Sequence, residues 1–170
     1  VDNKILHYAT SLTNKGFFSN IIVSKILSDS YFNNFSIEND TLIHYYGHDD
    51  VVEIPDGITR VVEGAFKWKP IKTIKCPPSL KRFDGTLIKC EKLECFEAPG
   101  LEEFSTELFS KNKTIKKVVL GSAQKIPKDA FYSCTSLRNV IIPNVKTIGS
   151  YAFHNCAVTI VEAPLVQEVK

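Results

Sequence analysis

The sequence predicts a repeat solenoid, a stack of short coils, rather than a globule of unrelated elements. The first observation is that residues 125–143 return almost residue for residue at 146–164. The second is a proline or glycine column spaced by 22, 22, 22, 22 and 21 residues. This column consists of Pro55, Pro77, Pro99, Gly121, Pro143 and Pro164. Since one such unit cannot bury its apolar face alone, the units must stack.

Each unit has an apolar pattern that predicts one short strand before the proline column. The residue three positions before that column is Val52, Ile74, Phe96, Val118, Val140 or Val161. A second apolar or small residue follows two positions later, and this alternation indicates a strand with one buried face. A third apolar residue stands further upstream in most units, which completes an L-x-x-L-x-L pattern. A period of 20 to 29 residues is typical of leucine-rich repeats.

After the strand, each unit carries a bulky apolar residue followed three positions later by a small or polar one. The second of these columns reads Lys69, Cys90, Asn112, Cys134 and Cys156. Asparagine can satisfy unpaired backbone groups in a closing turn, and a thiol is a small residue with a weak donor. We therefore expect Cys90, Asn112, Cys134 and Cys156 to form a buried structural ladder. Free thiols are favoured over a Cys134–Cys156 disulfide, which the expected spacing does not exclude.

These columns resemble the BspA-like class of leucine-rich repeats. The matching segments are IPKDAFYSCTSLRNVIIP and VKTIGSYAFHNC, and the resemblance extends over about residues 51–170. It implies an α/β fold: a right-handed, horseshoe-type leucine-rich repeat solenoid with a parallel β-sheet, short strands and a few short helical turns. It also implies a surface-antigen type of protein, with adhesion or host binding as the expected role and no catalytic residues. Lys69, Gly121 and Thr86-Leu87 depart from the family pattern.

Residues 1–50 are less regular and are expected to form a divergent repeat or cap, followed by repeats of about 22 residues over 51–170, the last of them truncated. Residues 23–34 echo the later units, although an amphipathic helix with Phe18, Ile22 and Ile26 on one stripe is the alternative. Alternating apolar residues over 35–45 predict a β-hairpin. Asn34 and Asn39 begin glycosylation sequons, and so does Asn112, where the ladder leaves no room for a glycan.

The outward side of the expected sheet is the candidate binding surface. Its first half alternates in charge from unit to unit, which predicts ion pairs between neighbouring strands rather than a ligand site. Its second half carries apolar residues that point outward beside polar ones, and such clusters mark contact surfaces. We name this second half the sheet-face patch. It consists of Val119, Ile141, Ile160, Lys117, Arg138 and Asn139.

Composition and motifs argue against several function classes. A net charge of +2 does not indicate nucleic-acid binding, and no apolar run approaches the ~20 residues needed to span a bilayer. No catalytic motif is present, so we expect no enzyme and no cofactor. His44 and His48 are four residues apart, but their strand-like context argues against a metal site.

The sequence thus predicts a non-enzymatic binding module of a cell-surface or secreted protein, with a protein partner or a surface glycan. The alternative is an intracellular, cytoplasmic scaffold or assembly subunit built on the same solenoid. Free thiols without a disulfide pattern would suit that alternative.

Overall fold

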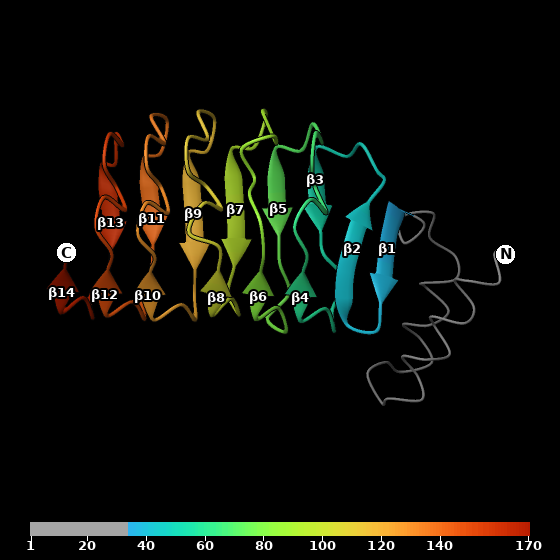
Figure 1. Cartoon of the computed structure of the whole chain (residues 1–170), viewed down its shortest axis with the longest axis horizontal. Coiled ribbons are helices and arrows are strands. Elements are labelled where there is room, and N and C mark those ends of the chain that lie inside the picture. The colour runs from blue at the N-terminus through green and yellow to red at the C-terminus, as the bar shows by residue number, and fades with distance from the viewer. Residues whose placement is uncertain (1–33) are drawn as a thin grey trace, which may run out of the picture.

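The computed structural model describes residues 34–170 as a β-solenoid of about six turns (Figure 1). Its first sheet has the spatial order β13-β11-β9-β7-β5-β3, with one strand from each turn. The strands are β3 (Val51–Glu53), β5 (Thr73–Lys75), β7 (Cys95–Ala98), β9 (Lys117–Leu120), β11 (Asn139–Ile141) and β13 (Ile160–Glu162). All neighbouring pairs in this sheet are parallel. The expectation of a solenoid with a parallel sheet is therefore confirmed.

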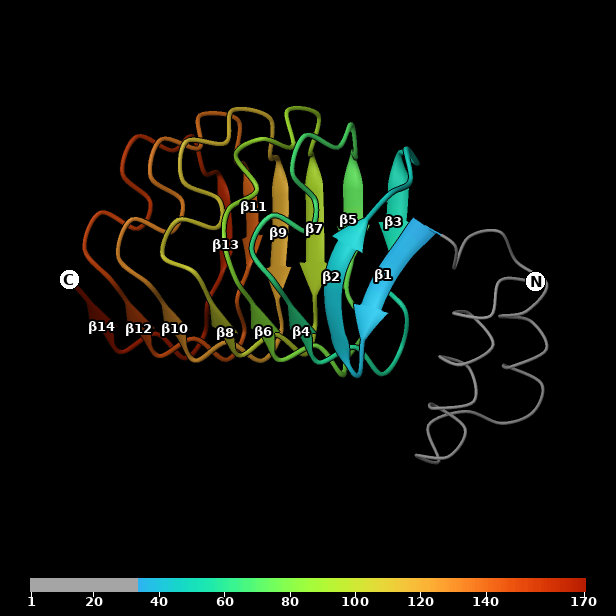
Figure 2. The same cartoon turned by 45° about the vertical axis from the view of Figure 1, so that its right-hand side comes forward.

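A second row of strands lies on another side of the coils (Figure 2), and the sequence predicted only its first members, the hairpin over residues 35–45. Its first sheet contains β1 (Phe35–Glu38), β2 (Thr41–Tyr45), β4 (Arg60–Val61), β6 (Arg82–Phe83) and β8 (Glu103–Phe104). Its second sheet contains β10 (Lys125–Ile126), β12 (Thr147–Ile148) and β14 (Glu168–Val169). From β4 onward these strands follow the proline column, where the sequence indicated only a turn.

The second row is interrupted between β8 and β10, while the first sheet continues across the same turns. At the other positions in this row, the residue after each strand donates its N–H to the preceding turn. Gly149, for example, donates to the carbonyl of Ile126 at 2.9 Å, and Ser105 donates to that of Phe83 at 3.2 Å. The equivalent residue after β10 is Pro127, which has no N–H to donate. One bond between β8 and β10 therefore cannot form.

The expected short helical turns are wrong for residues 34–170, where no α-helix occurs. The segment around Phe131 shows why. The N–H groups of Ala130 and Tyr132 bond locally, three residues back, whereas those of Phe131 and Ser133 bond carbonyls of the next turn at 2.9 and 2.8 Å. This alternation uses positive φ angles, 57° at both Asp129 and Ser133, and is incompatible with a continuous helix.

The antiparallel pair β1 and β2 lies within residues 35–45 and extends the second row, because β2 pairs in parallel with β4. Tyr45 of this hairpin is fully buried, and its ring lies 5.7 Å from that of Phe66. The hairpin therefore covers the first regular turn. The echo at residues 23–34, apart from its last residue, and the alternative helix fall outside the described residues.

The core is a continuous column of apolar side chains inside the coils. Its bulky members stack ring on ring: Phe109 lies 5.0 Å from Phe131, with 11° between the planes, and Phe131 lies 5.0 Å from Phe153. The inward strand positions are fully buried from Val52 to Val140, whereas Val161 in the last turn is 53% exposed. Each turn is therefore stabilised by the turn on either side of it.

Candidate functional site

The first half of the outward sheet face is occupied by ion pairs between adjacent turns. Lys72 bonds Asp50 at 2.7 Å, and Lys75 bonds Glu53 at 2.9 Å. Further along, Lys116 bonds Glu94 at 3.0 Å. These groups are largely exposed, so they contribute little to stability, but they satisfy one another across the strands.

The sheet-face patch starts at β9, the turn in which the row of ion pairs ends. Val119 of β9 and Ile141 of β11 lie directly opposite each other in the parallel register, and both are half-buried. Ile160 of β13 is 50% exposed and lies opposite Asn139 in the neighbouring outward column. The structure therefore places the three apolar members on adjacent strands of one face.

The polar members of the patch differ in whether their side chains already form hydrogen bonds or ion pairs within the chain. The Lys117 ammonium bonds Glu97 at 2.7 Å, and this hydrogen bond raises the pKa of Lys117. The Arg138 guanidinium donates to the carbonyls of Thr135 and Leu137, at 3.1 and 3.2 Å. Asn139 Oδ1 is buried without a hydrogen-bond partner within the described structure. Lys117 therefore belongs to the row of ion pairs between neighbouring strands. The sequence did not indicate this pairing.

The column of Cys90, Asn112, Cys134 and Cys156 connects each turn to the preceding one. Cys90 donates to the carbonyl of Phe66 at 3.1 Å, and Asn112 Nδ2 donates to that of Leu87 at 3.1 Å. The thiols of Cys134 and Cys156 donate to the next two acceptors, Phe109 O and Phe131 O, both at 2.9 Å. In every case the acceptor is the carbonyl of the bulky core residue one turn earlier.

All five cysteines of the chain are free thiols. Burial raises the pKa of Cys76, and it raises that of Cys90 to about 12. The hydrogen bond with the neighbouring thiol of Cys156, together with burial, raises the pKa of Cys134. Cys95 is half-buried, and burial followed by the charge of Glu97 raises its pKa as well. The hydrogen bond with Cys134 lowers the pKa of Cys156 instead. Raised pKa values make the other four thiols poor nucleophiles, so Cys90 and Cys134 in particular are suited to a structural role.

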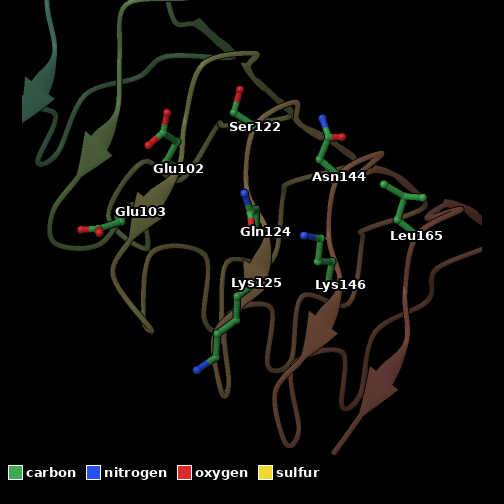
Figure 3. Close-up of a pocket in the computed structure, with 8 residues that line it drawn as sticks. All are labelled: Glu102, Glu103, Ser122, Gln124, Lys125, Asn144, Lys146 and Leu165. Atoms are coloured by element: carbon green, nitrogen blue, oxygen red, sulfur yellow. The ribbon is translucent and has the colours of Figure 1, made fainter.

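A polar groove lies across the interruption between β8 and β10 and encloses about 680 Å³ (Figure 3). Its lining residues are Glu102, Glu103, Ser122, Gln124, Lys125, Asn144, Lys146 and Leu165. The acidic side is already paired, Glu102 with Lys81 at 2.8 Å and Glu103 with Arg82 at 3.4 Å. The apolar pattern of the sequence does not indicate this groove, although its side chains recur at fixed positions after the proline column.

The histidine pair shows no metal geometry. The ring of His44 contacts that of Tyr46 at a tilt of 59°, with 4.6 Å between ring centroids. Burial, followed by the charge of Lys69, lowers the pKa of His44. Over residues 34–170, no group of three or more histidine, cysteine, aspartate or glutamate side chains could hold a metal ion. No helix within the same residues is long and apolar enough to cross a membrane.

Comparison with known proteins identifies the repeat. No curated protein matches the sequence. A leucine rich cell surface protein from Faecalibacterium prausnitzii A2-165 matches in structure with a TM-score of 0.49 and 18% identity, over 79% of this chain and 48% of that one. The match thus spans about half of that solved chain. The family model for the BspA type leucine rich repeat region matches residues 25–160 in six copies. Because that match covers most of the sequence, this chain belongs to the BspA-type leucine-rich repeat family.

Proposed function

We propose that this chain is a non-enzymatic binding module of a cell-surface or secreted protein, and that it binds a protein partner through the sheet-face patch. The observation that carries the proposal is the change of character along one outward face. Ion pairs fill its first turns, whereas Val119 and Ile141 stand side by side in its later turns with no charged residue between them. A cluster of this kind on a rigid sheet is typical of a contact surface.

The polar members complete the proposed surface. Lys117 and Arg138 border the apolar residues with charged groups, and Asn139 offers an amide whose buried oxygen lacks a partner. A bound partner that draws the Asn139 side chain outward would satisfy this oxygen, which otherwise carries a desolvation cost. The repeat family, in which binding rather than catalysis is typical, agrees with this role.

The test is binding of the fluorescently labelled chain to cultured epithelial cells. We expect saturable binding that the double variant Val119→Asp with Ile141→Asp abolishes, because two buried carboxylates would oppose an apolar contact. The matched control is Lys146→Asp, which changes charge in the polar groove instead. Protease treatment of the cells should remove the binding, whereas loss on glycosidase treatment would identify a glycan as the partner. Unchanged binding by the double variant would refute the patch.

The alternative is an intracellular scaffold or assembly subunit, and the five free thiols favour it. The two proposals differ in where the protein is found. Protease added to intact cells that make the full-length protein should digest a surface protein and spare an intracellular one. A second readout is the redox state of the cysteines in protein isolated from those cells, since an intracellular scaffold should retain every thiol.

A further inference from the structure

A second recess, distinct from the sheet face and from the groove at β8 and β10, lies among the loops that close the coils. It encloses about 360 Å³ and is lined by Thr106, Glu107, Ser110, Lys111, Asp129 and Tyr132. Two consecutive turns contribute to it, one through residues 106–111 and the next through Asp129 and Tyr132. We call this recess the Tyr132 slot.

The slot exists because one column of the repeat changes residue type. Ser110, Tyr132 and His154 occupy equivalent positions, each one residue after a core phenylalanine and 22 residues apart. The rings of Tyr132 and His154 are stacked, with centroids 5.3 Å apart and 12° between the planes. On the other side of Tyr132 the column continues with Ser110, whose side chain has no ring. The face of Tyr132 that turns away from His154 is therefore left uncovered by any aromatic group of its column.

The spacing of the turns suits a flat ligand at this position. In the core directly beneath, Phe109, Phe131 and Phe153 stack at 5.0 Å, which is the distance at which neighbouring rings pack. The backbone of the slot is also fixed, because Lys111 N–H bonds the carbonyl of Tyr132 at 2.7 Å and Tyr132 N–H bonds that of Asp129 at 3.0 Å. A ring above Ser110 would therefore meet a preformed surface.

The polar lining defines the chemistry of that ligand. Glu107 and Asp129 supply carboxylate acceptors, Thr106 and Ser110 supply hydroxyl groups, and Lys111 supplies an ammonium donor. Asp129 lies 3.8 Å from Lys128, which partly offsets its charge. Because both signs of charge are present, the lining favours a neutral ligand with many hydroxyl groups over an ion. An aromatic face beside such donors and acceptors suits the apolar face of a sugar ring.

We propose that the Tyr132 slot binds a single pyranose sugar, stacked on the face of Tyr132 opposite His154, with its hydroxyl groups bonded by Glu107, Asp129 and Lys111. This site is separate from the sheet-face patch and does not depend on it. The chain would then bind a glycan at the loops that close the coils, in addition to a protein partner at the sheet-face patch.

The test is saturation-transfer NMR on the purified chain with the methyl glycosides of glucose, galactose, mannose and N-acetylglucosamine. We expect at least one of them to bind with a millimolar dissociation constant. Tyr132→Ala should weaken that binding about tenfold through loss of the stacking surface, whereas Tyr132→Phe should retain it. Tyr151→Ala is the matched control, because Tyr151 contacts His154 edge-on and does not line the slot.

Ser110→Phe is the decisive second variant, since it places a ring where the sugar would stack and extends the aromatic column without removing a core contact. It should abolish sugar binding, whereas the NMR spectrum of the folded chain and its melting temperature should stay unchanged. The proposal is overturned if no glycoside binds, or if Ser110→Phe binds as the wild type does. It is also overturned if arginine methyl ester or choline displaces the sugar at lower concentration, because the slot would then be a cation site.

Discussion

The thiol of Cys134 donates a hydrogen bond to the carbonyl oxygen of Phe109, 2.9 Å away and 25 residues earlier in the chain. The local N–H bonds of this segment run within one turn, and its backbone bonds between turns run from a turn to the following one. Ser133, for example, donates to His154 in the next turn. The thiol bond runs the other way, from a turn to the preceding one. Each turn is therefore bonded to the following turn by its backbone and to the preceding turn by its ladder side chain. Substitution of a ladder residue should show how much this second bond stabilises the chain.

We expect substitution of Asn112 to destabilise the chain more than substitution of any other ladder residue, because its side chain makes bonds through both the amide nitrogen and the oxygen. It is buried, its Nδ2 bonds Leu87 O, and its Oδ1 accepts from the N–H groups of Thr114 and Ile115 at 3.0 and 2.9 Å. Asn112→Ala leaves these groups unpaired and should lower the free energy of unfolding by about 3 kcal/mol. Asn112→Cys, which copies the neighbouring turns, should lower it less. Urea denaturation of both variants measures the difference, and equal losses would show that the thiol cannot replace the amide.

Truncation of the phenylalanine stack should have a cost that depends on position. Phe131 is fully buried between Phe109 and Phe153, so Phe131→Ala should destabilise the chain by about 3–5 kcal/mol. Phe153 has a described ring on one side only and is half-buried, so Phe153→Ala should cost clearly less. Thermal or urea unfolding monitored by circular dichroism gives both values. A larger loss at Phe153 would contradict the nearest-neighbour description of the core.

The cysteines should differ sharply in reactivity. With a thiol reagent in the folded state we expect the half-buried Cys156 and Cys95 to react, Cys156 faster because its pKa is lowered. The buried Cys76, Cys90 and Cys134 should react fully only after unfolding. The charge of Glu97 helps to raise the pKa of Cys95, so Glu97→Gln should lower that pKa and speed its alkylation at neutral pH. Mass spectrometry of labelled peptides measures both effects. Recovery of a native Cys134–Cys156 disulfide would instead contradict the free-thiol ladder.

Stability should decline at alkaline pH because the buried thiols stay protonated in the folded chain. Cys90 has a folded pKa raised to about 12 from 9.0, so between these values the unfolded chain loses a proton that the folded chain keeps. The free energy of unfolding then falls as pH rises, by up to about 1.4 kcal/mol per pH unit for this thiol. Below pH 9.0 its contribution is constant. Cys90→Ala should show a shallower alkaline decline, and an identical slope would mean that Cys90 ionises alike in both states.

The sequence predicted the turns of the solenoid well because burial repeats with the same period as the apolar residues. Val118 and Val140, for example, occupy equivalent inward positions and are both fully buried. Apart from the hairpin over residues 35–45, it did not predict the second row of strands, nor the lack of helix. Those features depend on hydrogen bonds between turns, such as Phe131 N–H to Ala152 O, and the spacing of side chains within one turn does not encode them.

The two proposed binding surfaces were also predictable only in part. The apolar columns placed Val119 and Ile141 on neighbouring strands, but they gave no sign that Lys117 pairs with Glu97 across a diagonal. The stacked pair of Tyr132 and His154 could have been found from their 22-residue separation, as the core phenylalanines were. The open space beside Ser110 could not be predicted in the same way. It depends on how two adjacent turns are placed relative to each other, which the three-dimensional structure shows and the sequence does not.

The interruption of the second row between β8 and β10 also has a mechanical consequence. Where β8 and β10 fail to pair, adjacent turns are joined by the first sheet and the core but not by the second row of strands. The solenoid is therefore softer against bending at this level than anywhere else along residues 34–170. A load applied along its axis should open this joint first and divide the rod into two stiff segments, one with five strands in the second row and one with three.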